Sequence, residues 1–135
     1  MQVRTSTLIG QQRAKLLMVG DGAKITPALR EAGFEIVIHM QDSGTMVTIL
    51  RERPLLVLLD LEMPMLNAWV ICSLIKKRSL LGPLSTIPVI IYSSLDEEEL
   101  VKKAARYGAE GYIHKDSDLG YAIEKISQYL KSKSA

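Results

Sequence analysis

The middle of the chain reads Leu55-Leu56-Val57-Leu58-Leu59-Asp60. Five apolar residues in succession, without alternation, are typical of a parallel strand that is covered on both faces. Asp60 then puts a carboxylate at the end of this strand, where an unpaired charge would be costly. The stretch therefore predicts a central parallel strand that ends at a candidate functional residue, which a cation would stabilise.

Short apolar runs of strand length recur on both sides of this stretch. They cover residues 15–19, 34–40, 88–92 and 111–113, and segments with helical spacing lie between and after them. Alternating strands and helices imply right-handed crossovers and a parallel sheet with helices on both faces. We therefore predict a doubly wound five-stranded α/β domain over residues 15–132, an N-terminal tail over 1–14 and a C-terminal tail over 133–135.

Residues typical of helix ends delimit five expected helices. The expected starts are Thr26 as N-cap with Pro27 in the first turn, Asp42 or Ser43, Asn67, Ser94 or Asp96, and Asp116 or Ser117. The expected ends are Gly33, Pro54, the region of Ser79, and Gly108.

Composition narrows the class of protein. At 135 residues, with 47% hydrophobic and 24% charged residues, the chain suits one globular domain. A net charge of +2 without a basic stripe argues against direct nucleic-acid binding. A single cysteine, Cys72, read as a buried structural thiol, and an N-terminus unlike a signal peptide favour the cytoplasm. No apolar stretch approaches the length that spans a membrane.

Polar residues follow most of the expected strands. Asp21 follows the first, Asp60 the third, Ser93 the fourth and Lys115 the fifth. Ligands of open α/β sheets bind outside the carboxyl ends of the strands, so these side chains should share one edge. Singly, each also has an ordinary explanation as a helix cap or a solvated charge. Together, two carboxylates suit Mg²⁺, and a hydroxyl and an ammonium suit a transferring phosphoryl group.

Three motifs in order resemble the receiver domains of response regulators. They are Asp60-Leu61-Glu62-Met63-Pro64, Ser93 after Pro88-Val89-Ile90-Ile91-Tyr92, and Gly108-Ala109-Glu110-Gly111-Tyr112-Ile113-His114-Lys115. The resemblance covers residues 15 to about 132. It implies a flavodoxin-like strand order, 2-1-3-4-5. It also implies a two-component signalling domain rather than an enzyme, with at most Mg²⁺-dependent self-phosphorylation and self-dephosphorylation.

The resemblance also implies roles for single residues. Asp60 would accept a phosphoryl group from a sensor histidine kinase or a phosphotransfer protein. Mg²⁺ would be bound by Asp21, Asp60 and the backbone carbonyl of Glu62, and Ser93 and Lys115 would contact the phosphoryl oxygens. Ser93 and Tyr112 would act as switch residues. They would signal to a surface made by the fourth helix, the fifth strand and the fifth helix, where a downstream protein binds.

Two departures from the family pattern bear on function. Gly20 stands where the family usually has a second acid, and losing such a partner costs about 10-fold to 100-fold in metal affinity or activity. Asp116 stands where proline commonly follows the lysine, so we expect a trans peptide bond there and a possible pairing of Asp116 with Lys115.

Two alternative functions remain open at this point. Gly20 favours a pseudo-receiver, which would act as a phosphorylation-independent interaction module. The Gly20-x-Gly22 turn weakly suggests a nucleotide-binding enzyme. The dinucleotide fingerprint, however, needs a third glycine where this chain has Ile25, and Asp21 would repel a pyrophosphate.

Overall fold

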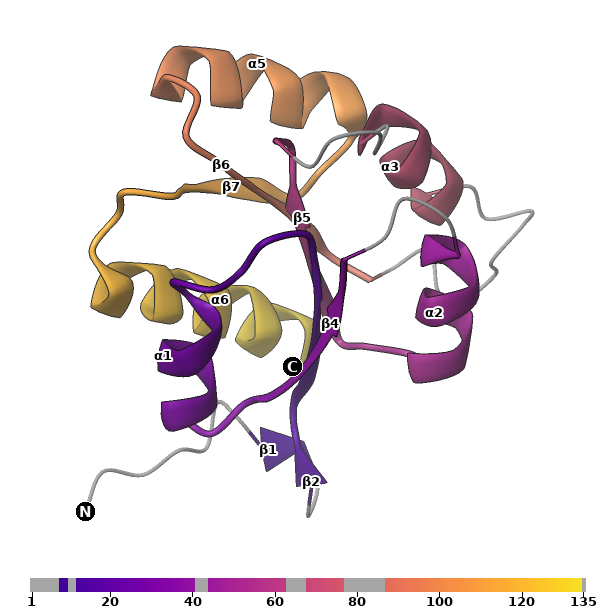
Figure 1. Ribbon diagram of the computed structural model, residues 1–135, viewed down its shortest axis with the longest axis vertical. Helices are drawn as coiled ribbons and strands as arrows, with labels where there is room; N and C mark the ends of the chain where they lie inside the picture. Colours follow the sequence, from indigo (N-terminus) through magenta and orange to yellow (C-terminus); the bar gives the residue numbers. More distant parts are fainter. Residues whose placement is uncertain (1–7, 10–11, 41–43, 63–67, 77–86, 135) are drawn as a thin grey trace.

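One parallel sheet forms the centre of the molecule. The computed structural model describes residues 8–9, 12–40, 44–62, 68–76 and 87–134 (Figure 1). The strands of the sheet are β3 (Lys15–Val19), β4 (Glu35–His39), β5 (Leu56–Asp60), β6 (Val89–Ser93) and β7 (Gly111–His114). Their spatial order is β4-β3-β5-β6-β7, and every pair is parallel. The predicted order 2-1-3-4-5 is confirmed.

Strand β5 is the central strand, as the apolar run predicts. It pairs with β3 on one side and β6 on the other, and all five of its residues are buried. The edge strand β4 differs, because two of its five residues are exposed. Both faces of β5 are therefore covered, and Asp60 lies at its buried carboxyl end.

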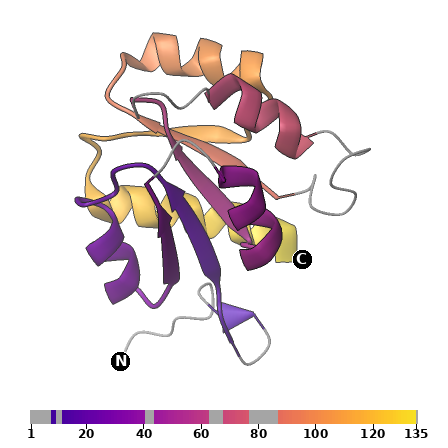
Figure 2. The ribbon, with the colours of Figure 1, turned by 45° about the vertical axis from the view of Figure 1, so that its right-hand side comes forward.

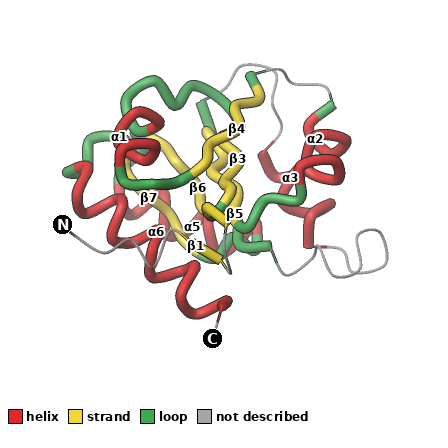
Figure 3. The backbone as a smooth tube through the Cα atoms, turned by 90° about the horizontal axis from the view of Figure 1, so that it is seen from below, coloured by secondary structure: helices red, strands yellow, loops and turns green. Residues whose placement is uncertain are grey.

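Helices cover both faces of the sheet (Figures 1 and 3). Helices α1 (Thr26–Glu31) and α6 (Leu119–Ser134) pack on one face, and α2 (Thr45–Glu52), α3 (Ala68–Lys76) and α5 (Glu97–Tyr107) pack on the other. Successive residues of β3 point to opposite cores: Leu16 and Met18 face α1 and α6, whereas Leu17 and Val19 face α2 and α3. None of the helices in the described ranges is long and apolar enough to cross a membrane.

Two helices begin at residues other than those predicted. The N-cap of α1 is Ile25 instead of Thr26, and Thr26 is buried inside the helix with no hydrogen-bond partner for its hydroxyl. Helix α6 begins at Leu119, because the carboxylate of Asp118 accepts a hydrogen bond of 3.1 Å from the backbone N–H of Tyr121. Asp118 therefore has the capping role that the sequence assigned to Asp116 or Ser117.

The other helix ends agree more closely with the prediction. Helix α2 ends at Glu52, and Arg53 adopts a left-handed φ of 46° immediately before Pro54. Gly108 ends α5 with a φ of 78°, and Gly33 follows the last turn of α1. Asp96 is the N-cap of α5, although its side chain makes no capping hydrogen bond. The predicted caps Asp42, Ser43 and Asn67, and the end of the third helix near Ser79, lie outside the described residues.

The segment expected as an N-terminal tail contains a short hairpin. Strands β1 (Leu8–Ile9) and β2 (Gln12–Arg13) pair in antiparallel fashion. The chain continues from β2 through the fully buried Ala14 into β3. The hairpin lies at the amino end of β3, opposite the end at which the strands gather their polar residues (Figures 1 and 2). The domain boundaries at residues 14 and 132 stay a prediction, and α6 continues to Ser134.

Candidate functional site

The carboxyl ends of three neighbouring strands form the candidate site. Asp60 ends β5, Ser93 ends β6, and Lys115 follows β7. The backbone N–H of Lys115 donates a 2.8 Å hydrogen bond to the carbonyl of Ser93, which fixes Lys115 beside β6. The parallel topology thus brings these predicted site residues to one edge of the sheet.

The carboxylate of Asp60 is buried, and both of its oxygens have hydrogen-bond partners. Only 2% of its side chain is exposed. The Lys115 ammonium lies 3.0 Å from Oδ1 and 3.1 Å from Oδ2. The backbone N–H groups of Glu62 and Asp21 donate to Oδ1 at 2.8 Å and to Oδ2 at 3.2 Å. The cation expected beside Asp60 is therefore supplied, in the protein itself, by Lys115.

Lys115 is shared between two carboxylates. Its ammonium also lies 2.8 Å from Oε1 of Glu62. Partial burial lowers the pKa of Lys115, but the hydrogen bonds to Glu62 and Asp60 more than offset this, so that the pKa is raised. Asp116 is not its partner, contrary to the pairing considered from the sequence; its backbone N–H donates to Nδ1 of His114 at 3.0 Å. The peptide bonds of the described residues, including the one after Lys115, are trans as predicted.

The side chain of Glu62 is a site residue that sequence reasoning missed. Its Oε2 accepts hydrogen bonds from the Ser93 hydroxyl at 2.7 Å, the Ser94 N–H at 2.7 Å and the Ser94 hydroxyl at 2.8 Å. Burial raises the pKa of Glu62, but the hydrogen bonds from Lys115, Ser93 and Ser94 outweigh it and lower the pKa to about 2. The sequence showed Glu62 two residues after Asp60, but it gave no sign of the direction of its side chain.

Gly20 is required by its packing against Asp60. Its φ of 115° is one that residues with a side chain rarely adopt, and a Cβ built there would lie 2.4 Å from the Cβ of Asp60. Its backbone N–H donates to the carbonyl of His39 at 2.9 Å. An acid at position 20 would therefore need a different path of the backbone.

The oxygen atoms of the residues predicted to bind magnesium are of the type that Mg²⁺ prefers. Asp21, Asp60 and the Glu62 carbonyl offer oxygen donors, and Mg²⁺ commonly uses one or two carboxylates and keeps several waters. The exposed carboxylate of Asp21 accepts from the Ala23 N–H at 3.1 Å, whereas the carboxylates of Asp60 and Glu62 both pair with the Lys115 ammonium. Within the described ranges, no group of three or more His, Cys, Asp or Glu residues could hold a metal ion. The site is therefore no closed protein cage.

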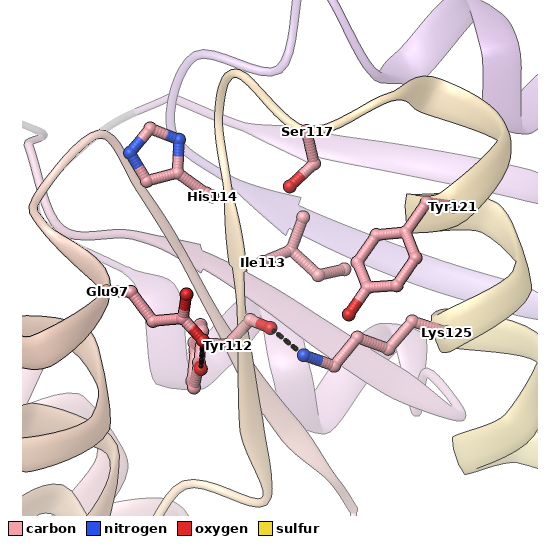
Figure 4. Close-up of a pocket in the computed structure, with 7 residues that line it drawn as sticks. All are labelled: Glu97, Tyr112, Ile113, His114, Ser117, Tyr121 and Lys125. Atoms are coloured by element: carbon pink, nitrogen blue, oxygen red, sulfur yellow. Dashed lines mark hydrogen bonds between the residues drawn. The ribbon is translucent and has the colours of Figure 1, made fainter.

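A small pocket of about 150 Å³ lies beside the site, between α5, β7 and α6 (Figure 4). Tyr112 of β7 donates from its hydroxyl to Oε2 of Glu97 on α5 at 2.7 Å. Lys125 of α6 donates to the carbonyl of Tyr112 at 2.7 Å and lies 4.4 Å from the centroid of its ring. Tyr112 therefore links the three elements of the surface expected to receive a downstream protein.

Cys72 lies in the core between α3 and the sheet, away from the candidate site. It is a free thiol with no exposed surface. Burial raises its pKa to about 12. The interpretation of Cys72 as a buried structural thiol agrees with these properties.

Comparison with known sequences identifies relatives of the whole domain. The response regulator receiver domain family matches residues 23–127. The protein PilH of Pseudomonas aeruginosa is 31% identical over 122 residues, which cover 87% of this chain and 98% of PilH. The chemotaxis protein CheY of Halobacterium salinarum is 30% identical over 120 residues, which cover 86% of this chain and 96% of CheY.

Longer relatives match over part of their length. The probable transcriptional regulator ycf27 of Porphyridium aerugineum is 28% identical over 108 residues, 77% of this chain, and the match spans 42% of the regulator. This chain thus covers about two fifths of such relatives.

Solved structures show the same fold. The BeF3-activated N-terminal receiver domain of RstA from Klebsiella pneumoniae superposes with a TM-score of 0.72 at 26% identity, over 86% of this chain and 97% of that one. A two-component response regulator from Clostridium difficile gives a TM-score of 0.75 at 19% identity, over 91% of this chain and 100% of that one, and shows the fold alone. The chain belongs to the response regulator receiver domain family of two-component signalling.

Proposed function

We propose that this chain is a phosphoacceptor receiver domain of a phosphorelay, in which Asp60 accepts a phosphoryl group from a histidine kinase or a phosphotransfer protein. One observation carries the proposal. A buried carboxylate lies at the carboxyl end of the central strand, with an ammonium at 3.0 Å and 3.1 Å from its two oxygens. Carboxylate and ammonium have the roles of nucleophile and charge stabiliser in phosphoryl transfer.

The chemistry needs an ionised carboxylate and groups that offset charge on the phosphoryl oxygens. An oxygen of Asp60 forms a bond to phosphorus while the bond from phosphorus to the donor's imidazole nitrogen breaks, and the electron pair of that bond stays on the nitrogen. The product is an acyl phosphate. Lys115 stays protonated, because its pKa is raised, and it can turn from Asp60 to the new oxygens. The hydroxyl of Ser93 is a second donor at the same edge.

Receiver domains bind Mg²⁺ for phosphorylation. In this chain Asp21, Asp60 and the backbone carbonyl of Glu62 would hold the ion, which would supply positive charge during phosphoryl transfer. With Gly20 in place of the usual acid, we expect a metal affinity that is lower by about 10-fold to 100-fold than with both acids present.

The signal would leave through the surface that α5, β7 and α6 form. Tyr121 of α6 and Val101 of α5 are apolar residues with half or more of their surface exposed, which suits contact with a protein. Ser93 and Tyr112 would act as the switch between Asp60 and this surface, since they lie on the adjacent, paired strands β6 and β7. We place the domain in the cytoplasm, with a protein rather than a nucleic acid or a membrane as its target.

Intact-mass spectrometry tests the proposal. The wild-type chain and Asp60→Asn would be incubated with phosphoramidate, with and without Mg²⁺. We expect one phosphoryl adduct on the wild type that depends on Mg²⁺ and is absent from Asp60→Asn, because the amide is not a nucleophile for phosphorus. An adduct that persists in Asp60→Asn, or none on the wild type at saturating Mg²⁺, contradicts the proposal.

Gly20 favours a second candidate, a pseudo-receiver that binds its partner without phosphorylation. The glycine removes an acid from the metal site and leaves Asp60 paired with Lys115. This candidate predicts no adduct on the wild type. It also predicts that Asp60→Asn binds the protein's partner as tightly as the wild type does.

A further inference from the structure

The carboxylate of Glu62 accepts hydrogen bonds from several donors at the edge of the sheet. It accepts from the hydroxyl of Ser93 at 2.7 Å and from the N–H and hydroxyl of Ser94 at 2.7 Å and 2.8 Å, and it pairs with Lys115 at 2.8 Å. The donors come from the ends of β6 and β7, whereas Glu62 follows β5. The side chain therefore bridges three strands at the place where Asp60 ends.

A phosphoryl group on Asp60 would need donors of the same kind. It carries close to two negative charges on three acceptor oxygens, which are satisfied by hydroxyl, N–H and ammonium groups. The ammonium that such a group would use already joins Asp60 at 3.0 Å and Glu62 at 2.8 Å. The new anion would appear beside an existing one, and the two would compete for the same cation.

The Glu62 side chain is partly open to solvent at this position. It is 37% exposed, while that of Asp60 is 2% exposed. A glutamate side chain in water is ionised at neutral pH, so Glu62 would remain an anion after it turned outward. Water can solvate the carboxylate once it turns outward, which makes displacement feasible without unfolding the site.

We propose that the carboxylate of Glu62 is a resident anion of the site, which holds Ser93, Ser94 and Lys115 in the unmodified chain and is displaced when Asp60 is phosphorylated. This inference rests on the proposed function. Glu62 acts here as a positioning residue: it keeps the donors turned toward the site, and it slows phosphoryl transfer because it occupies them.

The first arm of the test compares rates of phosphorylation. Glu62→Gln removes the charge and keeps the shape, and its backbone carbonyl still serves the metal. Glu31→Gln, at the exposed end of α1, is the matched control. With phosphoramidate and Mg²⁺, we expect the initial rate of adduct formation to rise about tenfold in Glu62→Gln. A tenfold change in rate corresponds to the net free energy of roughly one hydrogen bond. The control should match the wild type.

The second arm needs no phosphodonor. In ¹H–¹⁵N NMR spectra the Ser94 amide proton should lie far downfield in the wild type, because it is bonded to a carboxylate. It should move upfield in Glu62→Gln and in Glu62→Asp. The shorter side chain of aspartate keeps the charge but cannot reach the Ser94 N–H. Glu31→Gln should leave it unchanged.

The two arms separate the possible failures. Equal rates in the wild type and Glu62→Gln overturn the inference and leave the phosphoacceptor proposal standing. A Ser94 amide that does not move in either Glu62 variant also overturns it. If no variant forms an adduct, the phosphoacceptor proposal fails. The displacement then fails with it, and the position of the Ser94 amide proton shows whether Glu62 holds the donors in solution.

Discussion

At Gly20 the backbone passes so close to Asp60 that no side chain fits between them. The φ of 115° and the 2.4 Å approach of a hypothetical Cβ to the Cβ of Asp60 both require glycine. The next residue, Asp21, then points its N–H at Oδ2 of Asp60. The sequence showed only that an acid was missing here. The structure gives the glycine a packing role that no residue pattern could reveal.

Replacing Gly20 should destabilise the domain more than replacing a glycine that has a positive φ but no close neighbour. Gly108 is the matched control, since its φ is 78° and a Cβ there would meet nothing within 4 Å. We expect Gly108→Ala to cost about 1 kcal/mol in the free energy of unfolding. Gly20→Ala should cost on the order of 3 kcal/mol, because steric overlap adds to the strain. Urea unfolding measures both, and equal losses would contradict the clash with Asp60.

At the scale of elements, the existence of the strands was predictable and the helix starts were less so. A run of apolar residues is enough to specify a buried strand, which is why β3, β5 and β6 lie where the pattern places them. A helix start depends on which side chain reaches a free N–H, and several polar residues compete for that role. Thr26 and Ser117 were sensible candidates. Instead Asp118 accepts at the start of α6, and α1 starts after Ile25 without any side-chain capping hydrogen bond.

The cap of α6 can be tested with neighbouring substitutions. Asp118→Ala removes the acceptor for the Tyr121 N–H and should lower the free energy of unfolding by about 1 kcal/mol. Ser117→Ala, one residue earlier, should change it by less than about 0.5 kcal/mol, as is usual away from such features. Thermal unfolding of the two variants side by side measures the difference. A larger loss in Ser117→Ala would return the capping role to the residue expected from the sequence.

The contact between α5 and β7 should appear in the titration of Tyr112. The hydrogen bond to Glu97, helped by partial burial, raises the pKa of its phenol. The neutral phenol is the donor, so the bond is fully present below the usual pKa near 10 and is lost as the pH rises through the raised value. We expect Glu97→Gln to lower the pKa of Tyr112, as followed by ¹³C NMR of the labelled ring. The adjacent exposed variant Glu98→Gln should not lower it.

At the scale of the whole molecule, topology explains which site residues could be predicted. Parallel strands end at one edge, so Asp60, Ser93 and Lys115 had to meet once the strand order was known. The Glu62 side chain and Ser94 lie in loops, where sequence does not determine direction, and their contact spans 32 residues. The hairpin of β1 and β2 was missed because two-residue strands leave too short a pattern.

The same contacts suggest how the site communicates with the rest of the molecule. Glu62 accepts from the Ser94 N–H, the Ser93 hydroxyl accepts from the Leu95 N–H at 3.1 Å, and Asp96 then occupies the N-cap position of α5. One turn into the helix, the Leu100 N–H donates to the carbonyl of Asp96 at 2.9 Å. The loop from Ser93 to Asp96 therefore joins the site to α5, which contacts Tyr112 through Glu97.

If this loop carries the signal, loosening Glu62 should loosen the start of α5. We expect the Leu95 and Leu100 amides to exchange with solvent faster in Glu62→Gln than in the wild type, because both hydrogen bonds depend on the position of the loop. The Ala122 amide of α6, which donates to the carbonyl of Asp118 at 3.0 Å, is the internal control and should exchange at an unchanged rate. Hydrogen exchange followed by NMR resolves all three amides. Unchanged exchange at Leu95 and Leu100, together with a shifted Ser94 amide, would contradict this prediction. It would mean that α5 is held by its core contacts through Leu100 and Ala104. A signal from Asp60 would then reach Tyr112 along β7 instead.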